Sequence, residues 1–301
     1  MDAIVFCFGL IIGSFLNVCI VRIPKRKSIV LPPSACPCCG ARIRPYDNIP
    51  VVSWIALGGR CRNCKARISP MYPIVELMTA VLWAGCYRVF GLTVESLKWA
   101  VFSAILIVLI FTDLRDRILP DRVNYTGLAL GLGLSLVVSP TDGTSAWLAR
   151  HTVFSSLPAP VLSLADALLG AALGSGLLWL VSDLYFRFRG REGMGLGDIK
   201  MMLMAGAFLG PKRTFLMILL GSLLGSLLGF LVIGFLYLAG WKKKVALRGN
   251  RMGLGPVARL QFLLARRYQL PFGSYLGIAA IAVLFWGSPV VNWYESLLTV
   301  R

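Results

Sequence analysis

The stretch GMGLGDIKMMLMAGAFLG, residues 193–210, decides the fold of this chain. Three glycines alternate with large apolar residues before Asp198. The mainly apolar run that follows has about 12 residues, so at ~1.5 Å per residue a helix reaches only roughly 18 Å of a bilayer core that is ~30 Å thick. A carboxylate at membrane depth is costly and is a functional candidate. The stretch predicts a short helix within a membrane, with Asp198 below the membrane surface.

The rest of the chain also has the composition of a membrane protein. Of its 301 residues 57% are hydrophobic, and the mean hydropathy is +0.76, which is more apolar surface than a soluble domain of this size needs. We predict an all-α polytopic membrane protein with about eight transmembrane helices, the first of them retained and not a cleaved signal. The expected spans lie near residues 3–22, 73–92, 97–112, 123–139, 161–186, 199–210, 214–240 and 272–292.

The net charge of +18 is concentrated between these spans. Nucleic acid binding is one explanation, but bases between apolar spans favour contact with an anionic cytoplasmic leaflet. The segments 23–72, 187–200 and 241–271 are basic, whereas 140–160 contains only Arg150. Since Lys and Arg mark cytoplasmic loops, we expect the N-terminus outside and the three basic segments inside. The expected partners therefore include membrane lipids and no nucleic acid.

Cysteines in the 23–72 segment form two C-x2-C pairs with 21 residues between them. Such pairs can surround one tetrahedral zinc ion, whose binding supplies the folding energy that a small segment lacks. Two disulfides or a redox pair are the alternatives, but cytoplasmic thiols stay reduced. Cys38 is a spare thiol, because the two-residue spacing favours Cys39. The predicted zinc ligands are Cys36, Cys39, Cys61 and Cys64.

Carboxylates are the candidates for chemistry at the cytoplasmic face. His151, the single histidine, falls in the predicted outer segment, so a Ser-His or Cys-His nucleophile has no base inside. Most acids have simpler explanations, such as an i,i+4 ion pair of Asp183 with Arg187. Asp113 differs, because about 14 apolar residues separate it from the outer surface, which gives it a depth similar to that of Asp198.

Two carboxylates at one depth suggest a catalytic dyad. Close carboxylates share a proton, and such a pair can activate water and protonate a leaving amine, which is peptide hydrolysis of the aspartic type. A helix N-terminus favours the anion at Asp198 and a helix C-terminus disfavours it at Asp113. Asp198 is therefore predicted to act mainly as the base, and Asp113 to carry the proton.

The glycines before Asp198 have competing interpretations. A nucleotide or S-adenosylmethionine loop needs a preceding strand and the spacing G-x-G-x-x-G, whereas G-x-G-x-G follows a long apolar span here. Close packing of helices through small residues is a second explanation. It suits glycines that are four residues apart better than glycines that alternate with large residues next to an aspartate. We expect a substrate-site loop in which Gly195 and Gly197 carry the backbone inward and leave room for an extended chain.

Together these motifs resemble the type IV prepilin peptidases, polytopic membrane aspartic proteases of bacterial pilus, secretion and competence systems. The resemblance includes GSFLNVCIVRIP, both cysteine pairs, ISPMYPIVELMTA, DLRDRILPD, GMGLGDIKMM and LPFGSYLGIAA. It places the family's catalytic aspartates at Asp113 and Asp198 and its cysteine motif at the four predicted ligands. Three positions depart from the family pattern: Ala35 replaces a histidine, Cys38 is extra, and Ser274 replaces a proline in PFGPF.

The resemblance implies a multi-pass enzyme of the bacterial inner membrane that cleaves the short basic leader of prepilins and pseudopilins at the cytoplasmic face. It also implies N-methylation of the new amino terminus with S-adenosylmethionine, although no sequence feature locates the methyl donor. The predicted organisation is a first transmembrane helix at 1–22, a cytoplasmic zinc-binding domain at 23–72 and an aspartic peptidase domain at 73–301.

Three other functions remain alternatives to this interpretation. One is a peptidase without methylation. An ion-coupled transporter would need a continuous polar path, whereas most of the acids lie near one face. A thiol oxidoreductase would need its cysteines near the oxidising side, whereas they are expected inside.

Overall fold

The computed structural model describes residues 1–138, 143–150, 157–190, 193–238 and 271–299. His151 and nearly all of the basic segment 241–271 lie outside these residues. Within them the chain is helical, and its only β-pairing is two isolated bridges. The elements are α1 (Asp2–Arg22), η1 (Pro45–Asn48), α2 (Val52–Ala56), α3 (Met71–Phe90), α4 (Val94–Asp116), α5 (Asp121–Ser135), α6 (Thr144–Arg150), α7 (Ala159–Arg189), α8 (Leu196–Leu209), α9 (Pro211–Leu238) and α12 (Phe272–Thr299).

Each predicted span coincides with one of these helices, which confirms the all-α membrane class. In the described part of the chain, six helices are long and apolar enough to cross a membrane, namely α1, α3, α4, α7, α9 and α12. The helices α5 and α8 have 15 and 14 residues and are too short to do so alone. The structure therefore supports six candidate spans and two short helices in place of eight full spans.

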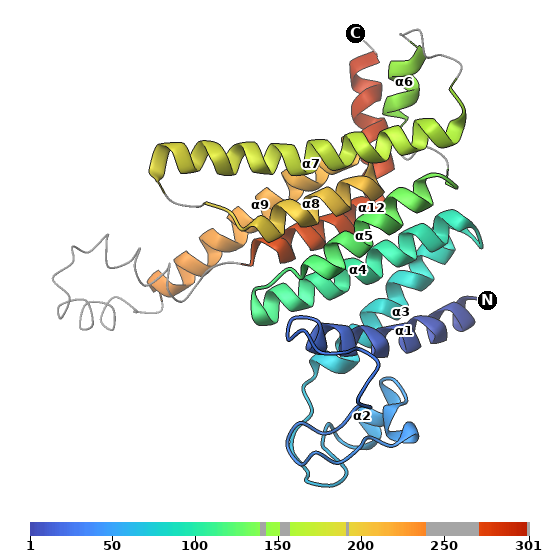
Figure 1. The fold of residues 1–301 in the computed structure, drawn as a ribbon, viewed down its shortest axis with the longest axis vertical. Helices are drawn as coiled ribbons and strands as arrows, with labels where there is room; N and C mark the ends of the chain where they lie inside the picture. Colours follow the sequence, from blue (N-terminus) through green and yellow to red (C-terminus); the bar gives the residue numbers. More distant parts are fainter. Residues whose placement is uncertain (139–142, 151–156, 191–192, 239–270, 300–301) are drawn as a thin grey trace, which may run out of the picture.

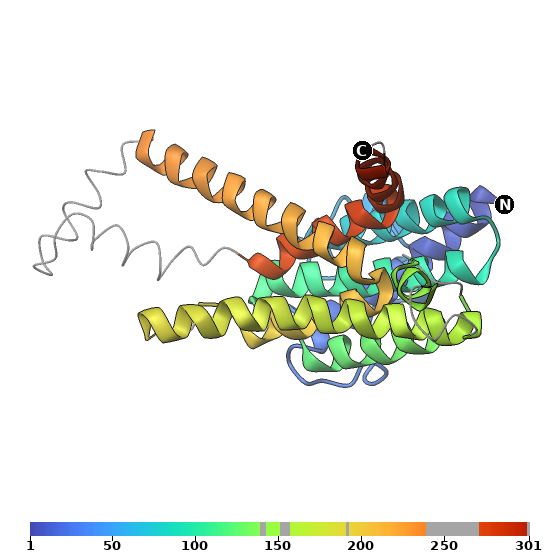
Figure 2. The ribbon, with the colours of Figure 1, turned by 90° about the horizontal axis from the view of Figure 1, so that it is seen from above.

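Successive helices of the bundle run in opposite directions (Figure 1). One end of the bundle therefore collects the ends of α1, α4 and α7 and the beginnings of α5, α8 and α12. The basic segment 23–72 follows α1, and the basic segment 187–200 joins α7 to α8, at this same end. Figure 2 shows α7 and α9 diverging toward it.

The most enclosed helix of the bundle is α4. Its apolar window is 61% buried, more than that of any other candidate span. The ring of Phe102 stacks on that of Phe208 in α8, with 4.7 Å between the centroids. In the last turn of α4, Leu114 and Arg115 are exposed, whereas Asp113 is only 6% exposed and is shielded from bulk water. Other core residues are Trp99, Leu106, Leu109, Met201, Met204, Leu276 and Ala280.

Helices α7 and α8 approach each other closely at a pair of glycines. A methyl group on Gly170 would lie 2.3 Å from the carbonyl oxygen of Gly206, and one on Gly206 would lie 2.2 Å from that of Gly170. Only glycine allows two helix backbones to come this near. The contact holds the short α8, which carries Asp198, against the 31-residue α7.

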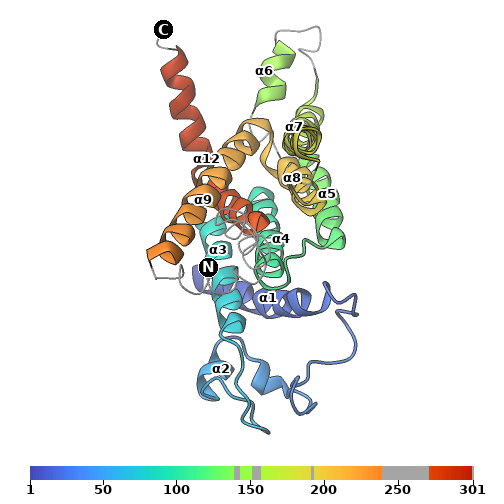
Figure 3. The ribbon, with the colours of Figure 1, turned by 90° about the vertical axis from the view of Figure 1, so that its left-hand side faces the viewer.

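The cysteine domain, residues 23–72, lies beside the bundle next to α1 and α3 (Figure 3). The guanidinium of Arg22 donates to the carbonyl oxygens of Ser28 at 3.0 Å and Pro32 at 2.7 Å. On the other side, the backbone N–H of Val51 donates to Glu76 Oε2 at 2.8 Å. These bonds attach the domain to α1 and to α3.

Candidate active site

Asp113 and Asp198 meet beside Gly273, the second residue of α12. A methyl group on Gly273 would lie 3.1 Å from Asp113 Oδ2 and 3.1 Å from Asp198 Oδ1. The two oxygens are therefore no farther apart than twice that distance. The structure brings together the two acids that the sequence paired by depth, and a third helix lies directly against both.

Helix ends place both aspartates at this position. Asp113 lies in the last turn of α4, which ends where Arg117 adopts a left-handed conformation with φ 55° and donates its N–H to the Asp113 carbonyl oxygen at 2.9 Å. Asp198 lies in the first turn of α8, after Gly195 as the N-cap residue. The two helices run in opposite directions, so an end of one meets a beginning of the other.

Ser274 is the contact residue that the sequence analysis missed. Its backbone N–H donates to Asp113 Oδ2 at 2.7 Å, and its Oγ lies 2.9 Å from the same oxygen. The proline expected here from the family pattern has neither donor. Hydrogen-bond donors stabilise a charged carboxylate, whereas the C-terminus of a helix destabilises one. The two influences on Asp113 therefore oppose each other. The helix ends alone do not decide which aspartate carries the shared proton. In the sequence, the serine in place of the second proline of PFGPF was the feature that could have indicated this contact.

Gly195 and Gly197 do not supply an unusual backbone conformation. Gly195 has φ −72°, and neither residue is among those with positive φ. A methyl group on Gly197 would lie 3.1 Å from Leu119 Cβ, which is a tight contact, whereas one on Gly195 would lie at an ordinary contact distance of 3.5 Å from Asp198 Oδ2. The assignment of both glycines to a substrate-site loop stays a prediction.

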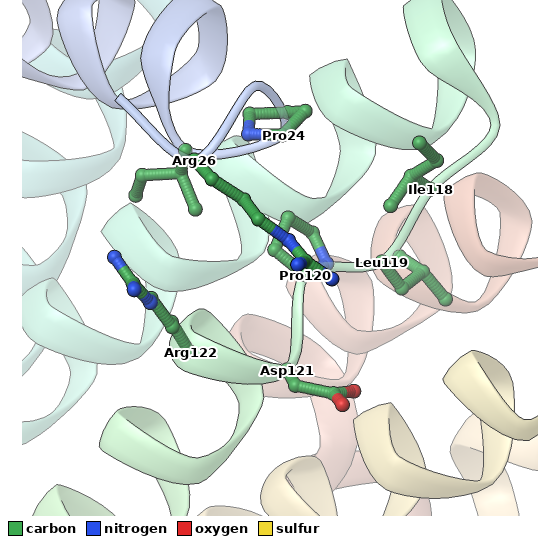
Figure 4. A pocket seen from close by; sticks show the side chains of 8 residues that line it. Pro24, Arg26, Ile118, Leu119, Pro120, Asp121 and Arg122 are labelled. Carbon is green, nitrogen blue, oxygen red and sulfur yellow. The ribbon is translucent and has the colours of Figure 1, made fainter. Parts of the chain in front are cut away.

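A cavity of about 490 Å³ lies at the same end of the bundle, between the loop after α1 and the loop from α4 to α5 (Figure 4). Leu119 lines this cavity, and its Cδ1 would lie 2.8 Å from a methyl group on Gly273. Leu119 therefore stands between the cavity and the aspartates. In Figure 4, Arg26 extends toward Pro120.

Other acids at this end are engaged elsewhere. Lys200 Nζ donates to Asp121 Oδ1 at 2.8 Å. Arg187 Nε donates to Asp183 Oδ2 at 2.8 Å, which is the predicted i,i+4 pair. Glu76 accepts from the cysteine domain, as described above. The pair of Asp113 and Asp198 is therefore the carboxylate pair with no basic partner among the ion pairs of the described residues.

Each cysteine pair of the 23–72 domain lies in a similar tight turn. The Gly40 N–H donates to the Cys36 carbonyl oxygen at 2.9 Å, and the Lys65 N–H donates to that of Cys61 at 3.0 Å. Gly40 and Lys65 have positive φ values of 71° and 58°. The repeated C-x2-C spacing thus corresponds to two equivalent turns that face each other.

The four predicted ligand sulfurs form one cluster. They all lie within 4.8 Å of one another, and Cys36 Sγ is 3.8 Å from Cys64 Sγ. Tetrahedral zinc with ~2.3 Å bonds separates its sulfurs by roughly 3.8 Å, whereas a disulfide needs ~2.05 Å. All eight cysteines are free thiols, and Cys38 stands outside the cluster. The arrangement is compatible with zinc and does not contain the alternative disulfides.

The surroundings of two thiols in the cluster shift their pKa values in opposite directions. Backbone N–H groups of Cys39 and Cys38 lower the pKa of the Cys36 thiol to about 6. The backbone N–H of Ala66 lowers the pKa of Cys64, but desolvation and the neighbouring thiols raise it more, to about 12. Adjacent thiolates repel one another, so four of them need a central dication.

The comparisons with known proteins agree with this site. Residues 7–90 match the Bacterial Peptidase A24 N-terminal domain, and residues 100–230 match the Type IV leader peptidase family. A prepilin leader peptidase/N-methyltransferase of Pseudomonas aeruginosa is 34% identical over 319 residues, which cover 97% of this chain and 93% of that relative. The chain belongs to the type IV leader peptidase family.

Further members of the type IV leader peptidase family are similar to this chain. A prepilin leader peptidase/N-methyltransferase of Aeromonas hydrophila is 32% identical over 97% of this chain and 93% of its own length. Another, from Myxococcus xanthus, is 37% identical over 77% of this chain and 62% of its own length. No solved structure matches the chain significantly. The four clustered cysteines fall in the first matched region and both aspartates in the second, and the resemblance stated from the motifs is confirmed.

Substituting Gly273 tests whether the space between the aspartates matters. In Gly273→Ala the new methyl group pushes against Leu119 and both carboxylates. We expect kcat of the peptidase to fall about 10- to 100-fold, because displacement of catalytic groups by even 1 Å is that costly. The free energy of unfolding should fall by no more than about 2 kcal/mol, because an overpacking cost of ~1–3 kcal/mol is partly offset by the ~1 kcal/mol by which alanine favours helix over glycine.

Gly176→Ala is the matched control for this substitution. Gly176 lies in α7, where an added methyl group meets nothing within 4 Å. Steady-state kinetics of the purified variants should show full activity for the control. Equal losses in both variants, or full activity of Gly273→Ala, would contradict the steric role.

Proposed function

We propose that the protein cleaves the short basic leader from type IV prepilins and prepilin-like secretion or competence proteins, and then N-methylates the new amino terminus. The meeting of Asp113 and Asp198 at Gly273 carries the peptidase part of the proposal. The relatives in Pseudomonas aeruginosa and Aeromonas hydrophila are named for both activities, which supports the proposal that cleavage is followed by methylation.

The two aspartates act on one water molecule. One carboxylate accepts a proton from water while the water oxygen attacks the scissile carbonyl carbon. The other, protonated carboxyl donates its proton to the leaving amine nitrogen as the carbon–nitrogen bond breaks. Ser274 holds Asp113 through two donors to one oxygen, so the second oxygen of Asp113 stays available for water or substrate.

The substrate chain passes beside the glycines before Asp198. Gly195 and Gly197 carry no side chain that would occupy this space, which supports their assignment to the substrate-site loop. An extended peptide exposes backbone groups that a side chain here would obstruct. The cavity behind Leu119 lies next to this path and offers space at the end of the bundle where the leader enters.

The active site is proposed to face the cytoplasm of a bacterial inner-membrane protein, with the N-terminus outside. Six apolar helices support a multi-pass protein that is surrounded by lipid. The aspartates lie at the end of the bundle where the basic segments 23–72 and 187–200 are attached, and basic loops favour the cytoplasmic side. Nucleic acid is not a proposed partner. The excess positive charge lies between the apolar spans of the sequence, where it can contact anionic lipid headgroups.

Zinc in the cysteine domain and S-adenosylmethionine are the proposed cofactors. Zinc held by Cys36, Cys39, Cys61 and Cys64 fits the sulfur spacing and supplies folding energy to the 23–72 domain, not chemistry at the aspartates. The domain division at residues 22 and 72 belongs to the same proposal. Peptide cleavage without methylation is the alternative function.

Membrane vesicles of known orientation test the peptidase and its sidedness together. A synthetic peptide with a basic leader and an apolar continuation is added outside the vesicles, and its products are identified by mass spectrometry. We expect a single cut between the leader and the apolar continuation in inside-out vesicles and none in intact right-side-out vesicles. Cleavage only in right-side-out vesicles would reverse the topology, and no cleavage in detergent-opened vesicles would contradict the peptidase.

A further inference from the structure

Ser274, in the first turn of α12, makes the surroundings of the two aspartates unequal. Its backbone N–H donates to Asp113 Oδ2 at 2.7 Å, and its hydroxyl oxygen lies 2.9 Å from the same carboxylate oxygen. Ser274 is completely buried, with an exposed fraction of 0%. Because no bulk water competes at this position, both donors act on the Asp113 carboxylate in a medium that strengthens hydrogen bonds.

The beginning of α12 opposes the unfavourable effect that the end of α4 has on a charge at Asp113. The N–H groups of the first turn of a helix carry partial positive charge. Ser274 is the third residue of α12, so its N–H belongs to this turn. That N–H also donates to the Pro271 carbonyl oxygen at 3.2 Å, but its bond to Asp113 is shorter. Asp113 therefore lies at the C-terminus of one helix and accepts from the N-terminus of another.

Asp198 has fewer hydrogen-bond donors than Asp113. It is partly buried, and within the described residues the backbone N–H of Gly195 is the one donor near its carboxylate. The N-terminus of α8 favours a negative charge there, but a hydrogen bond to a charged group is worth more than a helix end. The two donors to one oxygen of Asp113 therefore outweigh the single donor and the helix end at Asp198.

We propose that Asp113 is the base of the pair and that Asp198 carries the proton, because Ser274 keeps Asp113 ionised. This inference rests on the peptidase activity proposed above, and it reverses the assignment that the helix ends suggest. Ser274 is a positioning residue in this mechanism, since it acts on the substrate only through Asp113.

The proton transfers of the reaction follow from this assignment. A proton of the attacking water moves to Asp113 Oδ1 while the water oxygen bonds to the scissile carbonyl carbon. Oδ1 is the oxygen used, because both Ser274 donors are directed at Oδ2. Asp198 gives its proton to the leaving nitrogen, which keeps the electron pair of the broken carbon–nitrogen bond. The proton on Asp113 then returns to Asp198, and the pair is restored.

The hydroxyl of Ser274 has a second acceptor for the step in which Asp113 is neutral. It lies 3.2 Å from the Ile110 carbonyl oxygen, in addition to 2.9 Å from Asp113 Oδ2. A hydroxyl has one proton, and an ionised carboxylate attracts it more strongly than a backbone carbonyl does. When Asp113 gains a proton, the hydroxyl can turn to Ile110. The buried donor therefore has an acceptor in both states of the pair.

The opposite assignment fits these contacts less well. A protonated Asp113 beside an ionised Asp198 would direct two buried donors at the neutral carboxyl group. The negative charge would then lie on the carboxylate that has only the Gly195 N–H near it. Since hydrogen bonds to a charged group are stronger than those to a neutral one, this arrangement wastes the two donors of Ser274.

Substrates with different leaving groups test which aspartate is the acid. A peptide with a basic leader and an apolar continuation is made with either an amide or a thioester at the cleaved bond. A thiolate leaves without a proton, so the thioester needs a base but no acid. In lipid nanodiscs, Asp198→Asn should lose about 10³-fold in kcat on the amide but less than about 10-fold on the thioester, relative to wild type. Asp113→Asn should lose about 10³-fold on both.

Two results would overturn the assignment. One is recovery of Asp113→Asn, and not of Asp198→Asn, on the thioester. The other is a loss in Asp198→Asn that is equally large on both substrates. The proposed peptidase is tested separately by the wild-type enzyme: if it leaves the amide peptide uncut, the peptidase itself is contradicted, whereas normal wild-type cleavage with a reversed pattern overturns only the roles of the two aspartates.

Ser274→Ala tests the positioning role, with Ser103→Ala as the matched control. Ser103 is also 0% exposed, and its hydroxyl donates to the Ala100 carbonyl oxygen at 2.8 Å, far along α4 from the aspartates. Without its hydroxyl donor, Asp113 competes for the shared proton, so kcat on the amide should fall about 10-fold with KM unchanged. The control should keep its kcat, and thermal unfolding midpoints show that both variants are folded. Unchanged kcat in folded Ser274→Ala, or an equal fall in the control, would overturn the role of Ser274.

Discussion

Replacing either Asp113 or Asp198 by asparagine is expected to reduce leader cleavage by about 10³-fold or more, because the reaction then lacks its base or its acid. Asparagine keeps the size and shape of the side chain. The change also removes one of the two shielded carboxyl groups that converge at Gly273, and with it the cost of keeping an ionisable group there. The thermal unfolding midpoint should therefore stay the same or rise while kcat falls, and this combination separates a catalytic role from a structural one.

Asp183→Asn is the control for both substitutions. Asp183 lies near the same end of the bundle, but its partner is Arg187 on the surface of α7. An exposed i,i+4 pair contributes only about 0.3–0.5 kcal/mol, so the control should keep normal activity and stability. If either aspartate variant kept more than a tenth of the wild-type kcat, the dyad mechanism would be wrong.

Cys61→Ser is expected to release zinc from the purified protein and to unfold the 23–72 domain. Structural zinc in small domains contributes about 10–16 kcal/mol of apparent binding free energy, which such a domain cannot replace from its own core. The zinc content measured by mass spectrometry should fall from one ion per chain to none. Limited proteolysis should then cut between residues 23 and 72, while the helices of the bundle stay protected.

Cys38→Ser provides the internal control for this prediction. Cys38 is exposed and adjoins Cys39 in sequence but is not part of the sulfur cluster. It should keep its zinc and its resistance to proteolysis. Full zinc content in Cys61→Ser, or zinc loss in Cys38→Ser, would contradict the assigned ligand set.

Features that depend on neighbouring residues could be predicted from the sequence. The repeated C-x2-C spacing selects Cys36, Cys39, Cys61 and Cys64, because a short turn brings the two thiols of each pair to one side. Apolar length located the spans, since a helix rises by a constant amount per residue. Each predicted span coincides with a helix, and only the ends differ: α7 continues to Arg189, beyond the predicted residue 186.

Contacts between distant parts of the chain could not be predicted in this way. The hydrogen bonds from Ser274 to Asp113 join residues 161 positions apart, and no local periodicity encodes them. The tight contact of Gly197 with Leu119 is of the same kind, because the two residues are brought together only by folding.

The sequence by itself determined the membrane class, the helices, which four cysteines cluster and which two aspartates meet, because apolar length, residue spacing and the scarcity of buried acids are properties of the linear chain. The tertiary structure alone decided that Gly273 lies against both carboxylates and that Ser274 holds one of them. These relations depend on how α4, α8 and α12 pack, and packing is set by the whole folded core.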